Sequence, residues 1–294
     1  MKMKEVYLNI NCKVASFITV FLWASAFVLT KYVLKYTDVN TLAVIRYFIA
    51  GSILIFIVIK KKIFFPKILD LPFFFLAGFF GFSGYFILFN TAISLISPST
   101  ASIINTLSPA FTSIISYFLF KEKIKLIGWI SLLISFLGIL ILTLWNGRLS
   151  INIGIIYMFV ACLFISMYNV SQKWLSKKYN SFQVTTYSMI FGSLQLLIYS
   201  PNSLLNIVDF NLLIFLSILY MGLFPSVVAY IFWTRALEIS KTTTEVTSFM
   251  FVTPVLATIM GIIILGDIPK ISTFIGGGIV ILGMILFNKT KNQN

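Results

Sequence analysis

The sequence predicts an all-α integral membrane protein of ten transmembrane helices, built as two inverted five-helix repeats with both termini on the cytoplasmic side. Three observations predict this fold: a strongly apolar composition, basic residues concentrated in alternate gaps between apolar runs, and matching residues in the two halves. The chain has 294 residues, of which 59% are hydrophobic and 10% are charged, and its mean hydropathy is +1.01. A soluble domain carries about 25% charged residues, so we expect most of this surface to face lipid.

Apolar runs recur along the whole chain, and each is close to the roughly 20 residues that a bilayer span requires. Lys60, Lys61 and Lys62 end the second run sharply. The runs cover residues 14–34, 41–59, 73–95, 101–120, 127–145, 153–172, 183–200, 212–234, 246–265 and 273–288. They leave only short loops between them, so no separate soluble domain is expected.

Basic residues set the predicted orientation, because loops on the cytoplasmic side of a membrane are rich in Lys and Arg. Counted on alternate sides of the ten runs, 17 Lys and Arg lie on the side of the termini and 4 on the other, while Arg46 lies within a run. We therefore expect the chain in a bacterial cytoplasmic (inner) membrane with both termini in the cytoplasm. The net charge of +14 would point to nucleic acid in a soluble protein, but its placement between apolar runs argues against that partner.

The two halves, residues 1–146 and 147–294, match in residue types that seldom coincide in apolar sequence. The matched pairs are Gly51 and Gly192, Gly78 and Gly222, Ala92 and Ala236, Pro109 and Pro254, Glu122 and Asp267, and Gly138 and Gly283, at offsets of 141 to 145 residues. Because each half has an odd number of helices, the second half must enter the membrane upside down. Many secondary transporters are built this way and hold substrate near the midplane, between the halves.

Pro109 and Pro254 fall in the middle of the fourth and ninth runs. A proline inside a helix removes one backbone hydrogen bond and kinks the helix. Placed symmetrically, the two kinks are candidate hinges about which gates open. A static kink that improves packing is the alternative interpretation.

Arg46 is the one charged residue that lies clearly inside a run, away from its ends. A charge at membrane depth is costly and is usually functional. Arg46 is a candidate for binding an anionic group of a substrate. It lies about five residues from the outer end of its run, so a structural ion pair or a side chain that reaches the interface is an equally open interpretation.

Polar and aromatic residues within the runs are candidates for a substrate cavity, because amide and hydroxyl groups in lipid need partners inside the bundle. Hydrogen bonds between helices would explain many of them without a ligand. Asn105 is the preferred single candidate, because it precedes Pro109 by one helical turn. The candidates besides Arg46 are Trp23, Ser25, Tyr85, Asn90, Asn105, Tyr168, Asn169, Gln195, Tyr230 and Trp233.

At several of these positions the sequence resembles the drug/metabolite transporter superfamily, in its EamA-type branch. Trp23-Ala24-Ser25-Ala26-Phe27 is similar to a W-x-S-x-F pattern in the first helix, and Arg46 lies in a family-like stretch, Ala43–Tyr47. Leu119–Glu122 and Leu265–Asp267 are similar to the endings of the fourth and ninth helices, with Asp where the family usually has Glu. The resemblance covers nearly the whole chain and implies a ten-helix bundle that moves small metabolites, often outward, by alternating access.

The predicted function is a secondary transporter that exports amino acids or related small metabolites. An uptake permease or a multidrug efflux carrier is the alternative. A non-transporting assembly or receptor protein is more remote, because it would need a larger extramembrane segment than these loops. The expected partners are a small-molecule substrate and the lipid bilayer, and the oligomeric state stays open, a monomer included.

Residues that the chain lacks exclude other function classes. There is no histidine, and none of the eight acids lies in the middle of a run. A zinc site, aspartyl protease chemistry within the membrane and a proton relay through buried carboxylates are therefore not expected. No P-loop is present, so ATP-driven transport is not expected either. We predict no enzyme activity, no metal and no cofactor, and a facilitator, an exchanger or a carrier coupled to protons without a mid-membrane carboxylate.

Overall fold

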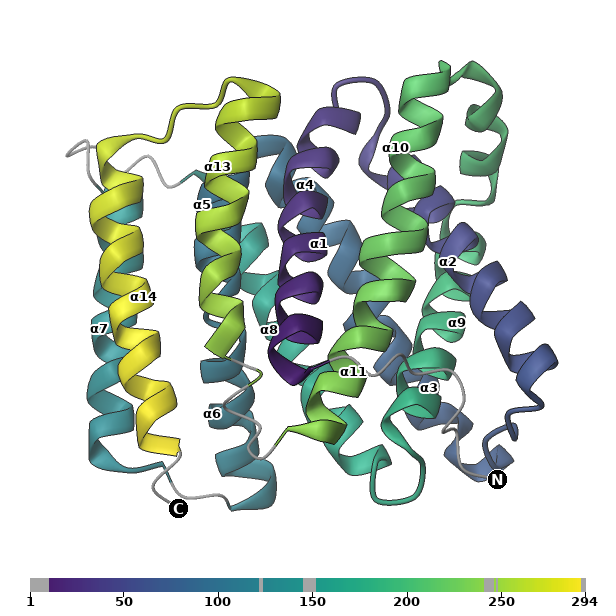
Figure 1. Ribbon diagram of the computed structural model, residues 1–294, viewed down its shortest axis with the longest axis horizontal. Helices are drawn as coiled ribbons and strands as arrows, with labels where there is room; N and C mark the ends of the chain where they lie inside the picture. Colours follow the sequence, from purple (N-terminus) through teal and green to yellow (C-terminus); the bar gives the residue numbers. More distant parts are fainter. Residues whose placement is uncertain (1–10, 122–123, 145–151, 241–245, 247, 292–294) are drawn as a thin grey trace.

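A computed structural model gives the structure of the chain and describes residues 11–121, 124–144, 152–240, 246 and 248–291. All regular structure in these residues is helical, and none of them forms a strand, which confirms the all-α prediction. Helix α1 (Cys12–Val33) begins and helix α14 (Ile271–Lys291) ends at the same end of the bundle (Figure 1). We call this the terminal end and the opposite one the far end. Glu122 and the predicted boundary at residue 146 lie outside the described residues.

The other elements follow the predicted runs, but several runs are divided into more than one helix. They are α2 (Val39–Lys61), the 3₁₀ helix η1 (Ile68–Asp70), α3 (Leu71–Gly78), the π-helix η2 (Phe79–Ser83), α4 (Gly84–Leu95), α5 (Pro98–Asn105), α6 (Ser108–Phe120), α7 (Leu126–Leu144), α8 (Ile153–Leu175), α9 (Ser181–Tyr199), the 3₁₀ helix η3 (Pro201–Asp209), α10 (Leu212–Leu223), the π-helix η4 (Phe224–Val228), α11 (Ala229–Ile239), the 3₁₀ helix η5 (Ser248–Val252) and α13 (Thr253–Leu265).

Seven helical segments in the described part of the chain are long and apolar enough to cross a membrane. They are Cys12–Val33, Val39–Lys61, Ile68–Leu95, Pro98–Phe120, Ile153–Leu175, Leu212–Leu237 and Ile271–Lys289. Two further apolar helices, Leu126–Leu142 and Phe249–Leu265, are shorter. Helix α9 is not among the seven, and it carries two glutamines and several serines and threonines. The chain is thus a multi-pass membrane protein, and the number of ten spans stays a prediction.

Short polar side chains determine where many of the helices begin. Asn11, Asp38, Asn152 and Asn211 each accept a hydrogen bond from a backbone N–H in the first turn of α1, α2, α8 and α10. Such caps satisfy donors that have no partner within the helix, and each contributes about 1 kcal/mol. The caps thus define the residues at which these four helices begin.

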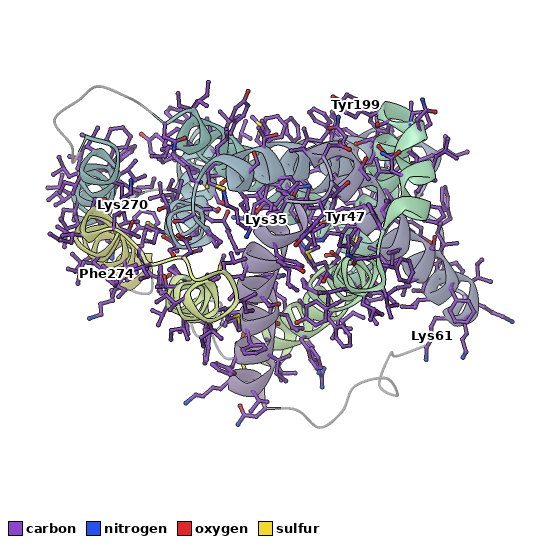
Figure 2. All side chains as sticks on the ribbon, turned by 90° about the horizontal axis from the view of Figure 1, so that it is seen from above. Lys35, Tyr47, Lys61, Tyr199, Lys270 and Phe274 are labelled. Atoms are coloured by element: carbon purple, nitrogen blue, oxygen red, sulfur yellow. The ribbon has the colours of Figure 1, made fainter. Side chains whose placement is uncertain are left out.

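The contacts between helices are symmetric: each contact has a counterpart between the equivalent helices of the other half. Helix α4 packs against α8 as α11 packs against α1, and α6 packs against α8 as α13 packs against α1. Helices α2 and α9, and likewise α7 and α14, are repeat equivalents that pack against each other. Figure 2 shows Phe274 of α14 and Lys61 of α2 on opposite sides of the bundle. These pairings are those of two repeats related by a pseudo-two-fold axis.

Backbone irregularities recur in the two halves at an offset of 145 residues. The π-helices η2 and η4 begin at Phe79 and Phe224 and interrupt equivalent helices. Lys121 (φ 56°) and Gly266 (φ 66°) both adopt the left-handed conformation that ends α6 and α13. Hydropathy does not reveal π-helical turns, which often occur at functional sites.

Helices α7 and α14 approach closely at matched glycines. A Cβ atom added to Gly138 would lie 2.6 Å from the Gly276 carbonyl oxygen, and one added to Gly283 would lie 2.8 Å from the Ser131 carbonyl oxygen. Small residues permit such backbone contact between membrane helices. The two halves therefore join here through a contact that both halves build in the same way.

Candidate substrate cavity

A cavity of about 510 Å³ lies between the two halves of the bundle. Side chains from α1, α4, α5 and α6 line it from the first half, and side chains from α8, α11, η5 and α14 line it from the second. Pockets for small molecules typically measure about 300–1,000 Å³. The cavity is therefore large enough for a small metabolite.

The cavity extends from the middle of the bundle to the terminal end. Gln172, Leu237 and Asn288 line it and lie in the last turns of α8, α11 and α14. Toward the far end, the rings of Phe27 and Phe89 meet edge to face, with centroids 5.0 Å apart. The cavity thus faces the terminal end, and aromatic side chains close it toward the far end.

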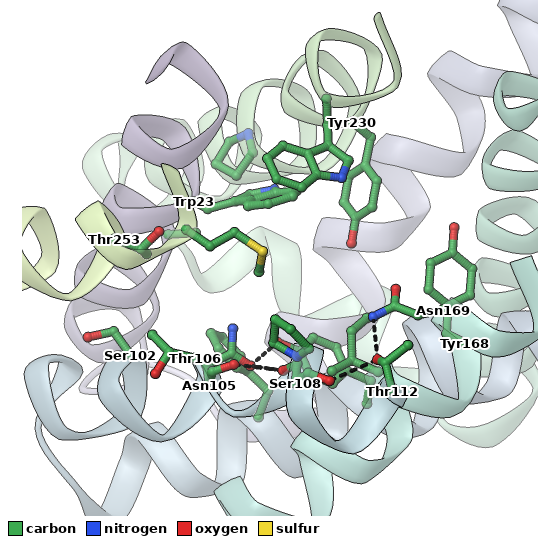
Figure 3. A pocket seen from close by; sticks show the side chains of 18 of the residues that line it. Trp23, Ser102, Asn105, Thr106, Ser108, Thr112, Tyr168, Asn169, Tyr230 and Thr253 are labelled. Carbon is green, nitrogen blue, oxygen red and sulfur yellow. Dashed lines mark hydrogen bonds between the residues drawn. The ribbon is translucent and has the colours of Figure 1, made fainter. Parts of the chain in front are cut away.

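One wall of the cavity is polar, and Figure 3 shows Asn105, Ser108, Thr112 and Asn169 along it. The first three recur at spacings of three and four residues, which places them on one face of the α5–α6 helix pair. Asn169 Nδ2 donates a hydrogen bond to Thr112 Oγ1 at 3.2 Å. The wall offers amide and hydroxyl groups from both halves of the molecule.

Asn105 is held in place through its side-chain oxygen. Tyr85 Oη donates a long hydrogen bond to Asn105 Oδ1 at 3.5 Å, and Ser108 Oγ lies at the same distance from this oxygen. Among the described residues, no acceptor pairs with the Asn105 NH₂ group. This group is therefore a donor that a ligand in the cavity can use.

The prolines do not kink continuous helices, which corrects that part of the prediction. The fourth run is two helices, α5 and α6, and Pro109 lies in the first turn of α6. Pro254 lies in the first turn of α13, after η5. A missing N–H costs little in a first turn, where intrahelical acceptors are absent. Ser108 Oγ donates to the Asn105 carbonyl oxygen at 2.7 Å, which satisfies the acceptor that an uninterrupted helix would have paired with residue 109.

The opposite wall is aromatic and apolar. The ring of Trp23 lies 5.5 Å from the ring of Tyr230 and 5.0 Å from that of Trp233, measured between centroids. Met250 and Phe251 extend this wall from η5. Figure 3 shows Trp23 and Tyr230 facing the polar wall across the cavity. A ligand between the walls meets hydrogen-bonding groups on one side and ring faces on the other.

Arg46 is the one charged side chain among the described residues that line the cavity. It is 2% exposed, and its Nε donates to Ser226 Oγ of η4 at 3.0 Å. Its guanidinium carbon lies 4.7 Å from the centroid of the Phe86 ring. Nη1 is buried without a partner among the described residues. Among the described residues, neither the ion pair nor the reach to the interface is observed, so Arg46 is a buried cation at the cavity with one donor unused.

Eight of the eleven predicted cavity residues line the cavity, and three form contacts between helices instead. Ser25 Oγ donates to the Leu22 carbonyl oxygen and shares a hydrogen bond with Tyr220 Oη. Asn90 Nδ2 donates to the carbonyl oxygen of Val39 at 3.2 Å. The third, Gln195, joins α9 to α3 and η2. The eight that line the cavity are Trp23, Arg46, Tyr85, Asn105, Tyr168, Asn169, Tyr230 and Trp233.

Sequence reasoning missed several polar lining residues. Thr112 and Ser108 lie on the same helix face as Asn105, so the spacing from Asn105 was a usable signal. Gln172 continues the α8 face that carries Asn169, again by helical spacing. Thr185 of α9 gave no such signal, because several serines and threonines surround it in the sequence.

Comparison with known proteins gives the family. The model of the EamA-like transporter family matches residues 12–144 and 152–289. The chain is 30% identical to the uncharacterized transporter YdfC of Bacillus subtilis, over 92% of this chain and 88% of that protein. It is 24% identical to a probable terminal-alkyne amino-acid exporter of Streptantibioticus cattleyicolor, over 92% and 91% of the two chains. A solved crystal structure, 16% identical, aligns with a TM-score of 0.62 over 94% of this chain and 95% of that one. The chain, a membrane transporter with two repeats, belongs to the EamA-like transporter family.

Proposed function

We propose that the protein exports small metabolites that carry a carboxylate or another anionic group, with amino acids and related compounds as the favoured class. Arg46 carries this proposal. A buried cation without a counter-charge is costly, and Nη1 of Arg46 has no partner among the described residues. An anionic group of the substrate would supply both the charge and the acceptor. The name of the Streptantibioticus relative supports amino acids as the class.

We further propose ten spans with both termini in the cytoplasm. The support is the distribution of 17 Lys and Arg on the side of the termini against 4 on the other side, because cytoplasmic loops are enriched in these residues. The terminal end is then cytoplasmic. A conformation whose cavity faces this end is the one in which an exporter would bind its substrate.

Export requires a second state in which the far end opens. Contacts that must break in that step include the Phe27–Phe89 ring contact and the hydrogen bond that Lys31 Nζ donates to the Ser94 carbonyl oxygen at 2.9 Å. The divided helices at Pro109 and Pro254 are the proposed hinges, because few backbone hydrogen bonds cross them. This exchange of open ends is alternating access.

The test combines a metabolite efflux screen with transport by purified protein in liposomes. Cells with and without the gene identify exported solutes, and liposomes then compare wild type with Arg46→Gln, Arg46→Lys and the far-end control Lys270→Gln. Hydrogen bonds to charged groups contribute about 1.5–3 kcal/mol, so we expect KM to rise about 10- to 100-fold in Arg46→Gln. Arg46→Lys should lose less, and Lys270→Gln should resemble wild type.

Several outcomes would overturn the proposal. Normal KM in a folded Arg46→Gln variant would remove the anion-binding role of Arg46. Transport of cationic or uncharged drugs in place of anionic metabolites would favour a multidrug carrier, to which the aromatic wall of Trp23 and Trp233 would also be suited. Accumulation of the solute inside cells that carry the gene would favour uptake over export.

A further inference from the structure

The segment that joins α2 to α3 presents an apolar and basic surface at the terminal end. Four apolar side chains lie beyond the end of α2 and point outward: Phe64, Phe65, Ile68 and Leu69 are 86%, 62%, 81% and 87% exposed. Lys60, Lys61, Lys62 and Lys67 flank them and are exposed as well. Figure 2 shows Lys61 at the outer edge of the bundle. The segment lies at the rim, where a membrane surface would meet it.

Hydrogen bonds connect the backbone of this segment to tyrosines of the second half of the molecule. The Tyr187 hydroxyl shares its one hydrogen between the carbonyl oxygens of Ile63 and Phe64, which lie 3.0 and 3.1 Å from Oη. The Lys67 N–H donates to Tyr179 Oη at 3.0 Å. The outward direction of the apolar side chains is therefore built into the fold, because the backbone groups beneath them already have partners.

Among the described residues, no acid forms an ion pair with a lysine of this segment. Asp70, the next acid along the chain, accepts hydrogen bonds from Lys178 Nζ and Tyr179 Oη, both at 2.7 Å. The Lys60 ammonium lies 5.7 Å from the centroid of the Phe56 ring, beside the apolar surface. The result is a dense positive charge next to exposed apolar side chains.

The equivalent segment of the second half is different. It joins α9 to α10 over residues 200–211 and contains no Lys or Arg, although Leu205 is 70% exposed. The repeat architecture therefore does not require the lysines of residues 60–67.

We propose that residues 60–69 bind anionic phospholipid. The apolar side chains enter the boundary between headgroups and acyl chains, as in interfacial anchors, and the lysines contact headgroup phosphates. Because Tyr179 and Tyr187 of the second half hold the segment, bound lipid stabilises the junction of the two halves at the terminal end. The inference does not depend on which solute is transported.

The test is the thermal unfolding of the purified full-length protein in a neutral detergent, titrated with phosphatidylglycerol, phosphatidylcholine or glycerol 3-phosphate. We expect the Tm to rise with phosphatidylglycerol alone. Each basic residue strengthens binding about fivefold. The triple variant Lys60→Gln/Lys61→Gln/Lys62→Gln should therefore need on the order of 100-fold more lipid for half of the shift. The matched variant Lys121→Gln/Lys177→Gln/Lys289→Gln, at the same end, should respond like wild type.

A second variant tests the apolar contact. Phe64→Ser/Leu69→Ser keeps all lysines and should reduce the shift with phosphatidylglycerol. An unchanged shift in this variant would overturn the insertion of these side chains. Equal losses in the two lysine variants, an equal response to phosphatidylcholine or glycerol 3-phosphate, or no shift in wild type would each overturn the lipid site.

Discussion

The two walls of the cavity derive from equivalent parts of the two halves, yet they differ in chemistry. In each half the helix is interrupted at the same place, just before Pro109 and just before Pro254. The side chains around the division are polar in the first half and mostly apolar in the second. At the offset of 145 residues, Asn105 corresponds to Met250, Thr106 to Phe251 and Ser108 to Thr253, and all six line the cavity.

The π-helices show the same division between shared backbone and different side chains. Gly81 in η2 corresponds to Ser226 in η4. A Cβ atom at Gly81 would lie 2.6 Å from the ring of Tyr168, whereas Ser226 Oγ accepts the hydrogen bond from Arg46 Nε. The two halves therefore share the backbone irregularities and differ in the side chains that these irregularities carry.

The symmetric contact between α7 and α14 should be the most sensitive to substitution. Gly138→Val and Gly283→Val each force a side chain into the backbone of the other helix. Overpacking of this kind typically destabilises by about 1–3 kcal/mol. We expect both variants to lose most of their monodisperse protein in fluorescence-detected size-exclusion chromatography.

Gly278→Val is the matched control, because no atom lies within 4 Å of a Cβ added at that position of α14. It should elute like wild type. A severe defect in one of the two test variants alone would show that the contact is not used equally by both halves, and an equal defect in the control would attribute the losses to glycine as such.

The polar wall should matter more for substrate binding than its apolar counterpart. Asn105→Leu removes the donor that faces the cavity, and a neutral hydrogen bond contributes about 0.5–1.5 kcal/mol. We therefore expect KM for transport in liposomes to rise about three- to tenfold. Met250→Leu keeps the volume and polarity of the opposite wall, so its KM should stay within about twofold of wild type. Equal changes in the two variants would contradict an oriented ligand.

A smaller effect is expected where η4 supports Arg46. Ser226→Ala removes the acceptor for Arg46 Nε while it leaves the charge, so KM should rise about two- to fivefold. The control is Ser83→Ala in η2, whose hydroxyl donates to Gln195 Oε1 at 2.5 Å between helices. It should lower the Tm with little change in KM. The opposite pattern, with KM altered by Ser83→Ala alone, would count against Arg46 as the substrate contact.

Apolar length and matched Gly and Pro positions are properties of the sequence itself, so they predicted the all-helical membrane fold and the two repeats, while the resemblance of short motifs predicted the family. The number of ten spans stays a prediction. The π-helices were not predictable. They depend on which backbone carbonyl finds a partner, as when Ser226 Oγ donates to the Met221 carbonyl oxygen five residues earlier.

The candidate site was predictable in part for a related reason. An amide or hydroxyl group within a span must find a partner, but the sequence does not state whether that partner is a ligand or another helix. Asn105 and Asn90 have the same chemistry. The rotation of α4 turns Asn90 toward Val39, whereas the division between α5 and α6 leaves Asn105 at the cavity.

The smallest effect is expected at the two loops that correspond in the halves. Hydrogen bonds from Lys178 and Tyr179 lower the pKa of Asp70 below its ordinary value. A lowered pKa contributes stability that is present above the unfolded pKa, about 4, and that is lost as pH falls through the folded pKa. Asp70→Asn should therefore lower the Tm slightly at pH 7, and its difference from wild type should shrink as the pH falls below about 4.

The second-half loop supplies the contrast that makes this pH dependence specific. Asn206 Nδ2 donates to Thr41 Oγ1 at 2.9 Å, and neither group titrates in this range. Asn206→Ala should lower the Tm by the same amount at pH 7 and at pH 3, measured by differential scanning fluorimetry on the purified protein. A pH-independent difference in Asp70→Asn would show that its loop, like that of the second half, is held by uncharged hydrogen bonds alone.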